Sequence, residues 1–250
     1  MKLSVNNISK TFKNHNEIQK VLTDISFEVR DGEFITLLGP SGCGKTTMLT
    51  IIAGFQKADK GTIRLDDEIV NGPGPDRAFV FQNYALFPWM TVEKNIRFPM
   101  IQMNIPEEQQ KQRMEYLLEI SNLKGREKLY PHQISGGMKQ RTALVRALAY
   151  MPKLLLMDEP LGALDVRMKQ RLQVELEEIW SAENLTIIMV THDVEEAVYL
   201  SDRIILMSTN EGEIVVDQHI PLERPRDRNS REFLGYVKDL SDRISQGENY

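Results

Sequence analysis

The feature that most restricts the fold of this chain is a glycine-rich run between an apolar segment and a helical one. Residues 39–46 read Gly-Pro-Ser-Gly-Cys-Gly-Lys-Thr and fit the pattern G-x-x-x-x-G-K-[ST]. Residues 34–38 before it are apolar apart from one threonine, and residues 45–53 continue as a helical pattern. In this pattern the backbone N–H groups of the loop converge on an anion at the start of the helix. The order of strand, loop and helix therefore predicts an α/β fold that binds phosphate groups.

The residues of this loop are of the types that bind a nucleoside triphosphate and its metal ion. The backbone from Gly42 to Thr46 would wrap the phosphates, and Lys45 would reach the outer two. The hydroxyl group of Thr46 would ligate Mg²⁺. The residues expected to contact the nucleotide are Gly39, Pro40, Ser41, Gly42, Cys43, Gly44, Lys45, Thr46 and Thr47. Many ATPases and GTPases share this loop, so alone it predicts nucleotide binding.

Two acidic residues follow a second apolar run. Residues 154–157 form the run, and Asp158 and Glu159 come directly after it. Phosphoryl transfer to water needs neutralised phosphate charge, a placed metal and a placed water. Asp158 would hold Mg²⁺ through water, because Mg²⁺ keeps most of its hydration shell, and Glu159 would act as general base. An isolated Asp-Glu pair is more often a solvated turn, but the phosphate loop upstream favours the catalytic interpretation.

Further patterns place other elements around these motifs. Apolar residues with a period near two, at 3–8 and 25–29, predict an antiparallel β-region. Strands are also expected at residues 61–65, 78–81, 154–157, 187–190 and 204–207, the last three being of the buried parallel type. Residues 106–123 have the pattern of an amphipathic helix and indicate a helical lobe. The tail from residue 222 onward is polar and is expected to add no regulatory domain.

Composition narrows the class of protein. The chain has 250 residues with a net charge of −5 at pH 7, which argues against nucleic acid as the main partner. The sequence has no run of about 18 apolar residues and no pattern of an export signal at its start. Its single cysteine, Cys43, excludes an internal disulfide and suits a reducing compartment. Cys43 is interpreted as a small residue that fits a tight loop, with a redox switch as the alternative. We therefore expect a cytosolic chain whose membrane role would need other subunits.

A third motif identifies the class of nucleotide-binding protein that the chain resembles. Residues 135–141 read Ser-Gly-Gly-Met-Lys-Gln-Arg, about one helix before the run that ends in Asp158 and Glu159. With this motif, the chain resembles an ATP-binding cassette (ABC) ATPase from Phe12 to about Arg228. The resemblance implies an α/β P-loop NTPase fold with a mainly parallel sheet, an N-terminal antiparallel β-region and a helical subdomain. The implied single domain, residues 1–250, has a RecA-like core at about 1–90 and 150–222, a helical subdomain at about 91–149 and a short C-terminal tail at 223–250.

The resemblance implies roles for three more residues. Phe12 would stack on the adenine of ATP, although an aromatic residue in an N-terminal strand is often part of the core. Gln82 would contact Mg²⁺ or water and sense a membrane partner, and otherwise is an ordinary loop amide. His192 would contact the γ-phosphate, whereas a lone histidine is more often structural. The expected catalytic residues are Lys45, Gln82, Glu159 and His192, and the expected metal ligands are Thr46, Gln82 and Asp158.

The Ser-Gly-Gly motif is expected to act on a second copy of the chain. A serine hydroxyl and glycine N–H groups at a helix start form an anion site, but the phosphate loop already supplies one within the chain. By resemblance, Ser135, Gly136 and Gly137 would cap the γ-phosphate of ATP bound to the opposing copy, so that a homodimer encloses two ATP molecules. Residues 162–165 match the loop that crosses this dimer seam. A flexible turn before a helix is the alternative interpretation.

Finer features resemble one subgroup of the family. Residues 72–77, 87–92 and 225–228, with Met138 in place of the usual glutamine, look like the ATPase subunits of nitrate, sulfonate and taurine importers. By the resemblance, glutamine at this position would donate a hydrogen bond across the seam, which the thioether of Met138 cannot do. The subgroup implies two membrane-spanning permease subunits, an indirect link to a substrate-binding protein and a place on the cytoplasmic face of the cell membrane. Phe87, Pro88 and Trp89 are candidates for an exposed apolar contact with a permease, or for simple loop packing.

Two other functions share the core motifs. An ATPase of an ABC exporter or of a lipoprotein-release system would carry the same phosphate loop and signature, and only the subgroup features argue against it. A non-transport ABC protein acting on DNA or ribosomes usually has a long coiled-coil insertion or a second cassette. The chain shows neither feature, so the importer is the preferred interpretation.

Overall fold

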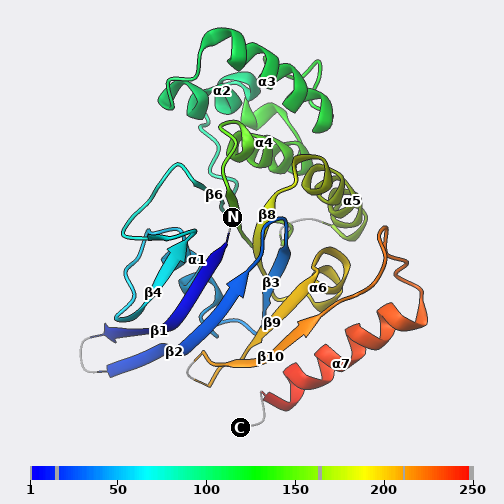
Figure 1. The fold of residues 1–250 in the computed structure, drawn as a ribbon. Coiled ribbons are helices and arrows are strands. Elements are labelled where there is room, and N and C mark those ends of the chain that lie inside the picture. The colour runs from blue at the N-terminus through cyan, green and yellow to red at the C-terminus, as the bar shows by residue number, and fades with distance from the viewer. Residues whose placement is uncertain (1, 15–16, 163–164, 211, 248–250) are drawn as a thin grey trace. The chain divides into compact units, whose positions relative to one another are not determined.

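The computed structural model describes residues 2–14, 17–162, 165–210 and 212–247 (Figure 1). The chain divides into two compact units. The first unit combines residues 1–74 and 185–250, and the second comprises residues 75–184. Each unit has its own sheet strands and helices, so each is described by itself.

The first unit begins with an antiparallel sheet, as the sequence predicts for residues 3–8 and 25–29, and its strand order is β2-β1-β4-β5. Its strands are β1 (Leu3–Asn14), β2 (Glu17–Val29), β4 (Lys60–Leu65) and β5 (Glu68–Ile69). β1 pairs with both β2 and β4. Leu3, Val5 and Ile8 on β1 are buried, which explains the apolar period of the segment.

A second set of strands in this unit is mainly parallel and buried. β3 (Phe34–Leu38) pairs in parallel with β8 (Thr186–Thr191) and β9 (Arg203–Met207), and β10 (Ile214–His219) pairs antiparallel with β9. Every residue of β3 and β8 is buried. Leu38 and Thr191 are register partners at the carboxyl ends of β3 and β8. The phosphate loop after β3 and His192 after β8 therefore leave the same edge of the strands.

The C-terminal segment contains a helix that the sequence analysis did not predict. α7 (Arg231–Gly247) packs against α6 (Val194–Leu200) and is drawn in red in Figure 1. Phe233 and Leu240 on α7 are fully buried. The apolar residues 233, 237, 240 and 244 follow a helical period. The segment as a whole is polar in composition, so this period is easily overlooked.

The motif at residues 225–228 holds the end of α6. The guanidinium of Arg226 is buried and donates to the backbone oxygens of Val198, Tyr199 and Ser201 at 2.7, 3.1 and 2.7 Å. It also donates to the oxygen of Ile220 at 3.0 Å. These carbonyls include the last ones of α6, which have no partner within the helix, and the positive charge also suits the negative end of the helix dipole.

We expect Arg226→Met to destabilise the chain strongly. Methionine fills a similar volume but leaves several buried carbonyl groups without a donor, at about 1–3 kcal/mol for each group that finds no water. The loss should be about 3 kcal/mol or more and is measured by urea unfolding. Arg243→Met, which alters an exposed arginine paired with Asp239, is the control and should unfold like the wild type. Equal unfolding midpoints for both variants would contradict this account of Arg226.

The second unit joins a parallel strand pair to several helices. β6 (Arg77–Val80) and β7 (Leu154–Asp158) pair in parallel. The helices are α2 (Val92–Gln102), α3 (Glu107–Ile120), the 3₁₀ helix η1 (Pro131–Gln133), α4 (Gly136–Leu148) and α5 (Val166–Glu183). α2 packs against α3 and α4 (Figure 1). Among the described residues, no helix is both long and apolar enough to cross a bilayer.

Two largely buried ion pairs link the helices of this unit. Arg141 on α4 binds Glu175 on α5 through two hydrogen bonds of 2.7 and 2.6 Å. Arg113 on α3 binds Glu183 at the end of α5 in the same two-pronged way, at 2.9 and 2.7 Å. The planar guanidinium fits a carboxylate at both oxygens, so each pair fixes orientation as well as distance. These pairs join α3 and α4 to α5.

Candidate functional site

The phosphate loop has the backbone that its glycines predict. Gly44 has φ +94°, and a Cβ atom there would lie 2.6 Å from the backbone oxygen of Val21. Glycine is required for both reasons. Gly44 is also the N-cap of α1 (Lys45–Ile52), which has no side-chain cap and no acidic residue in its first turn. The first N–H groups of α1 are therefore suited to an anion.

Lys45 is held against the loop itself. Its side chain is buried, and Nζ donates to the backbone oxygens of Gly39 and Pro40 at 2.8 and 2.7 Å. Two carbonyl partners fix the ammonium group within the loop, so its charge lies where phosphate oxygens would gather. Thr46, one residue on, is exposed, as are Ser41 and Gly42.

Cys43 fits the small-residue interpretation. The residue is buried, and burial raises the pKa of its thiol above the ordinary value although the Lys45 ammonium acts to lower it. Its Sγ lies 2.9 Å from the place of a Cβ at Gly39, so the side chain fills the space beneath the loop. A protonated, enclosed thiol lacks the thiolate character of a redox-active cysteine.

We expect the folded chain to resist thiol alkylation. Because the pKa of Cys43 is raised, its thiolate fraction at pH 8 is smaller than that of a free cysteine, and the rate should increase only at higher pH. Iodoacetamide labelling followed by mass spectrometry should be at least about tenfold slower in the folded chain than in urea. A folded chain labelled as fast as the unfolded one would instead indicate a reactive, accessible thiol.

His192 is exposed on a turn that buried polar groups hold in place. The Thr191 hydroxyl donates to Glu196 Oε2 at 2.6 Å and accepts from the Asp193 backbone N–H at 3.1 Å. Asp193 caps α6 by accepting from the Glu196 backbone N–H at 2.9 Å. The sequence analysis singled out His192 but missed Glu196. The only signal for Glu196 in the sequence is an acidic residue in the first turn of a helix. The turn presents His192 at the carboxyl edge of the strands.

Phe12 is a surface residue of β1. Its side chain is 37% exposed, and Lys10 Nζ lies 5.6 Å from the centre of the ring. The core interpretation is therefore wrong for Phe12, and its ring is available for stacking.

In the second unit, the parallel pairing of β6 and β7 brings two predicted residues together. Val80 and Met157 are register partners, so the segments that follow the two strands begin at the same edge. Gln82 Nε2 donates to Glu159 Oε2 at 3.2 Å. Glu159 has a left-handed backbone, φ +43°, which is uncommon outside glycine, and Asp158 ends β7 beside it. Asp158 and Glu159 are both partly exposed.

The three residues predicted as metal ligands offer only oxygen or amide groups. Thr46 is exposed in the first turn of α1, and Asp158 is partly exposed at the end of β7. Hydroxyl, carboxylate and amide oxygens are the donors that Mg²⁺ takes, with several waters retained. Among the described residues no cluster of three or more His, Cys, Asp or Glu could hold a metal. The donor set therefore fits a Mg²⁺ ion held mainly by phosphate and water.

Ser135 begins α4 in the way the signature predicts. Its side chain caps the helix by accepting from the Met138 N–H at 3.3 Å, and Ser135 and Gly136 are exposed. Gly137 is buried, and a Cβ there would lie 2.9 Å from Met168 Sδ on α5. Gly137 thus allows α4 and α5 to approach closely, a role that the sequence alone does not show.

The loop predicted to cross a dimer seam is described only in part. Ala163 and Leu164 lie outside the described residues. Gly162 N–H donates to the Glu159 backbone oxygen at 3.2 Å, and a Cβ at Gly162 would lie 3.6 Å from Glu159 Oε2. Asp165 caps α5 by accepting from the Met168 N–H at 3.0 Å. A side chain at position 162 would therefore contact Glu159.

The aromatic segment after Gln82 is partly exposed. Trp89 is 68% exposed, and its ring centre lies 5.5 Å from that of Phe87. Phe87 also packs against Phe98 on α2, with ring centres 5.0 Å apart. Phe87 is therefore fixed by packing, whereas Trp89 presents its ring to solvent.

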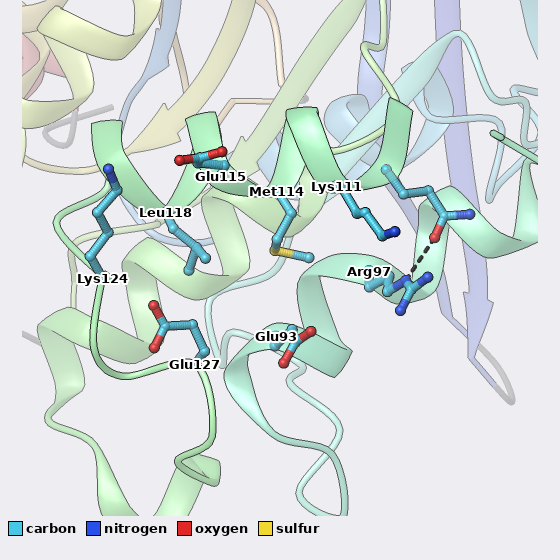
Figure 2. A pocket seen from close by; sticks show the side chains of 9 residues that line it. Glu93, Arg97, Lys111, Met114, Glu115, Leu118, Lys124 and Glu127 are labelled. Carbon is cyan, nitrogen blue, oxygen red and sulfur yellow. Dashed lines mark hydrogen bonds between the residues drawn. The ribbon is translucent and has the colours of Figure 1, made fainter. Parts of the chain in front are cut away.

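A cavity in the second unit is lined by side chains of both charges. It has a volume of about 380 Å³ and lies between α2, α3 and the segment that follows α3 (Figure 2). Glu93, Glu115 and Glu127 are among its lining residues, together with the apolar side chains of Met114 and Leu118. The basic side chains of Arg97, Lys111 and Lys124 also line the cavity, so acidic and basic groups are balanced there. None of the residues predicted to contact the nucleotide is among those that line this cavity.

Several known proteins are similar to this chain over most of its length. The family model for ABC transporters matches residues 22–162. An uncharacterized ABC transporter ATP-binding protein of Methanocaldococcus jannaschii is 47% identical, over 96% of this chain and 90% of its own. The aliphatic sulfonates import ATP-binding protein SsuB of Bacillus cereus is 42% identical, over 99% of this chain and 97% of its own. A solved dimeric ATP-binding cassette, bound to ADP and Pi after hydrolysis, has a TM-score of 0.76 and 31% identity, over 87% of this chain and 98% of its own.

Proposed function

The chain belongs to the ABC transporter family and is an ATPase of that family, and from this premise we propose that it powers the import of a small anion. The anion is of the sulfonate, taurine or nitrate type. The observation that carries the import proposal is the 42% identity, over 99% of this chain, to a sulfonate import ATP-binding protein. The pairing of Gln82 with Glu159, at the edge where β6 and β7 end, supports the hydrolysis that would power import. In an importer, the amide that senses the membrane partner would thereby act on the carboxylate that activates water.

Nucleotide binding rests on the phosphate loop. Lys45 and the first N–H groups of α1 bind the phosphates of ATP, and the ring of Phe12 stacks on adenine. The ammonium of Lys45 is already held by two carbonyls of the loop, so little ordering entropy is lost on binding. Thr46, Asp158 and Gln82 would hold Mg²⁺ together with water, and the bound ion would neutralise phosphate charge.

Hydrolysis rests on Glu159, Gln82 and His192. The Glu159 carboxylate accepts the proton of the attacking water. The Gln82 amide donates to Glu159 Oε2 and so orients that carboxylate. His192, on its braced turn, contacts the γ-phosphate of ATP. Glu159 is thus the general base, Gln82 orients the Glu159 carboxylate, and His192 contacts the charged γ-phosphate.

Two copies of the chain complete each site. Ser135 and Gly136 are exposed at the N-terminus of α4, which has no acidic residue in its first turn. This end of α4 caps the γ-phosphate held by the opposing copy, because an anion is stabilised by free N–H groups and the positive end of a helix dipole. ATP closes the homodimer, and hydrolysis reopens it.

The exposed aromatic segment would contact the membrane partners. Trp89, next to Phe87, offers an apolar ring on a surface that a permease subunit covers. The chain acts at the cytoplasmic face of the cell membrane with two permease subunits, which receive substrate from a separate binding protein. The transported anion is decided by those partners, since this chain does not touch it.

Uptake by cells separates the importer from the exporter. Cells lacking redundant transporters would carry either the wild-type chain or Glu159→Gln, and would be given labelled taurine, an alkanesulfonate, nitrate or a pyrimidine precursor. Loss of one uptake activity in the variant names the substrate and supports import. Unchanged uptake of all four would favour an exporter or a non-transport protein.

A further inference from the structure

Residues 81–91, which we call the connecting segment, join β6 to α2 without a helix or strand of their own. The segment contains Gln82 near its start and Trp89 near its end. Tyr84 and Ala85 both have left-handed backbones, with φ +64° and +45°. Such a conformation costs about 1 kcal/mol or more per residue outside glycine. Contacts from elsewhere must therefore hold the segment in this shape.

Arg146 on α4 holds the middle of the connecting segment. Its guanidinium donates to the backbone oxygen of Ala85 at 2.7 Å and to that of Tyr84 at 2.9 Å. The same group lies 5.6 Å from the centre of the Phe87 ring, within reach of a cation–π interaction. The Arg146 side chain thus contacts both residues with left-handed backbones and the aromatic residue Phe87 that follows them. Arg146 lies on the helix that begins with Ser135.

Asn95 on α2 holds the end of the connecting segment. This residue is fully buried. Its Oδ1 accepts from the Phe87 N–H at 2.9 Å. Its Nδ2 donates to the backbone oxygens of Phe87, Met90 and Thr91 at 3.2, 3.1 and 3.0 Å. The segment is therefore fixed at its start by the Gln82–Glu159 contact, in its middle by Arg146 and at its end by Asn95.

We propose that Arg146 is a positioning residue that makes the connecting segment move as one piece with α4, so that a displacement at Gln82 reaches Trp89. The proposal rests on the proposed function, because that function places ATP beside Gln82 and a membrane partner at Trp89. Without Arg146, the segment keeps its two ends but loses the restraint between them. A displacement at Gln82 would then be absorbed by the backbone at Tyr84 and Ala85.

The test uses Trp89 as a fluorescent probe in the full chain. The chain has two tryptophans, so Trp180→Phe leaves Trp89 alone. Acrylamide quenching and anisotropy of Trp89 are measured with and without Mg²⁺ and a non-hydrolysable ATP analogue. The analogue should change both quantities in the parent. Arg146→Met should reduce that change at least about fivefold while the affinity for the analogue stays within about threefold.

Arg113→Met is the matched control. Arg113 is also a largely buried arginine of this unit with a backbone contact, to the Leu148 oxygen at 3.0 Å, and its main partner is Glu183. These contacts do not involve the connecting segment, so the variant should lose stability but keep the full Trp89 response. Arg146→Lys keeps the charge without the planar fork and should give an intermediate response.

Several results would overturn the proposal. A full Trp89 response in Arg146→Met, or in Arg146→Lys if the methionine variant does not fold, would show that the link lies elsewhere. Equal losses in Arg146→Met and Arg113→Met would show a general effect of stability. A parent that hydrolyses ATP without any change at Trp89 would overturn this inference alone. A parent that neither binds nor hydrolyses ATP would overturn the proposed function instead.

Discussion

Glu159→Gln should lower the rate of ATP hydrolysis by about 10²–10⁴-fold, the usual contribution of a general base. Glutamine keeps the size of the side chain and an oxygen that can still accept from Gln82 Nε2, now 3.2 Å from Glu159 Oε2. It cannot take a proton from water. ATP affinity should be unchanged, because the phosphate loop is untouched, and an ATP-bound dimer should accumulate. Steady-state hydrolysis and size-exclusion chromatography with ATP measure the two effects.

A surface carboxylate on α5 provides the control for this variant. Glu178 is exposed, and Glu178→Gln removes the same charge away from the predicted nucleotide residues. Its hydrolysis rate should equal that of the wild type. If Glu159→Gln kept a rate within about threefold of the wild type, it would contradict the role of Glu159 as base. A slow variant that stays monomeric with ATP would instead contradict the enclosed dimer.

Ser135→Arg should lower the rate of ATP hydrolysis about 100-fold or more. The monomer should still bind ATP. The exposed hydroxyl at the start of α4 leaves room for the γ-phosphate of the opposing copy, and an arginine side chain would fill that room. A 100-fold loss corresponds to about 2.7 kcal/mol. Isothermal titration and steady-state hydrolysis measure the two properties. Loss of ATP binding would place Ser135 in the site of its own chain.

Two further variants separate the phosphate contact from the helix cap. Ser135→Thr keeps a hydroxyl that can accept from the Met138 N–H, now at 3.3 Å, and should remain active. Ser135→Asp also keeps a cap, but its charge would repel the phosphate, so it should be inactive although folded. Thermal unfolding confirms that both variants keep the helix.

Mixing two inactive variants tests whether Ser135 acts on the other chain. A dimer of one Ser135→Arg chain and one Lys45→Ala chain contains one site with intact Lys45 and intact Ser135, if the two residues come from opposite chains. Random mixing should then restore about a quarter of the wild-type rate. If both residues served the same chain, each site of the mixed dimer would lack one of them, and mixing would restore nothing.

Several parts of the site follow from short sequence patterns. The phosphate loop could be predicted because its glycines, Lys45 and Thr46 are consecutive, and the backbone of Gly44 meets its expected constraint. Asp158 and Glu159 could be placed because an apolar strand ends directly before them. His192 follows a strand in the same way. The resemblance to the ABC family depended on these local motifs, and the comparisons confirm it.

Other features depend on partners far away in the chain. Arg226 donates to backbone carbonyls of α6, and Arg146 donates to those of Tyr84 and Ala85. Every residue carries a backbone oxygen, so no residue type in the sequence marks these partners. Residues 225–228 could be noticed as a motif, but the reason for the motif is visible only in the folded chain. The burial of Asn95 was equally hidden, because asparagine is most often exposed.

The sequence by itself determined the nucleotide chemistry, the strand–loop–helix order and the family, because these reside in consecutive residues and in periods of two or 3.6. Only the tertiary structure showed that α7 packs against α6, that Gly137 admits Met168, and that Gln82 meets Glu159. Each of these contacts joins separate elements whose approach is decided by packing and strand register. Contacts between residues that are far apart in the sequence depend on the whole fold, and no local sequence pattern predicts them.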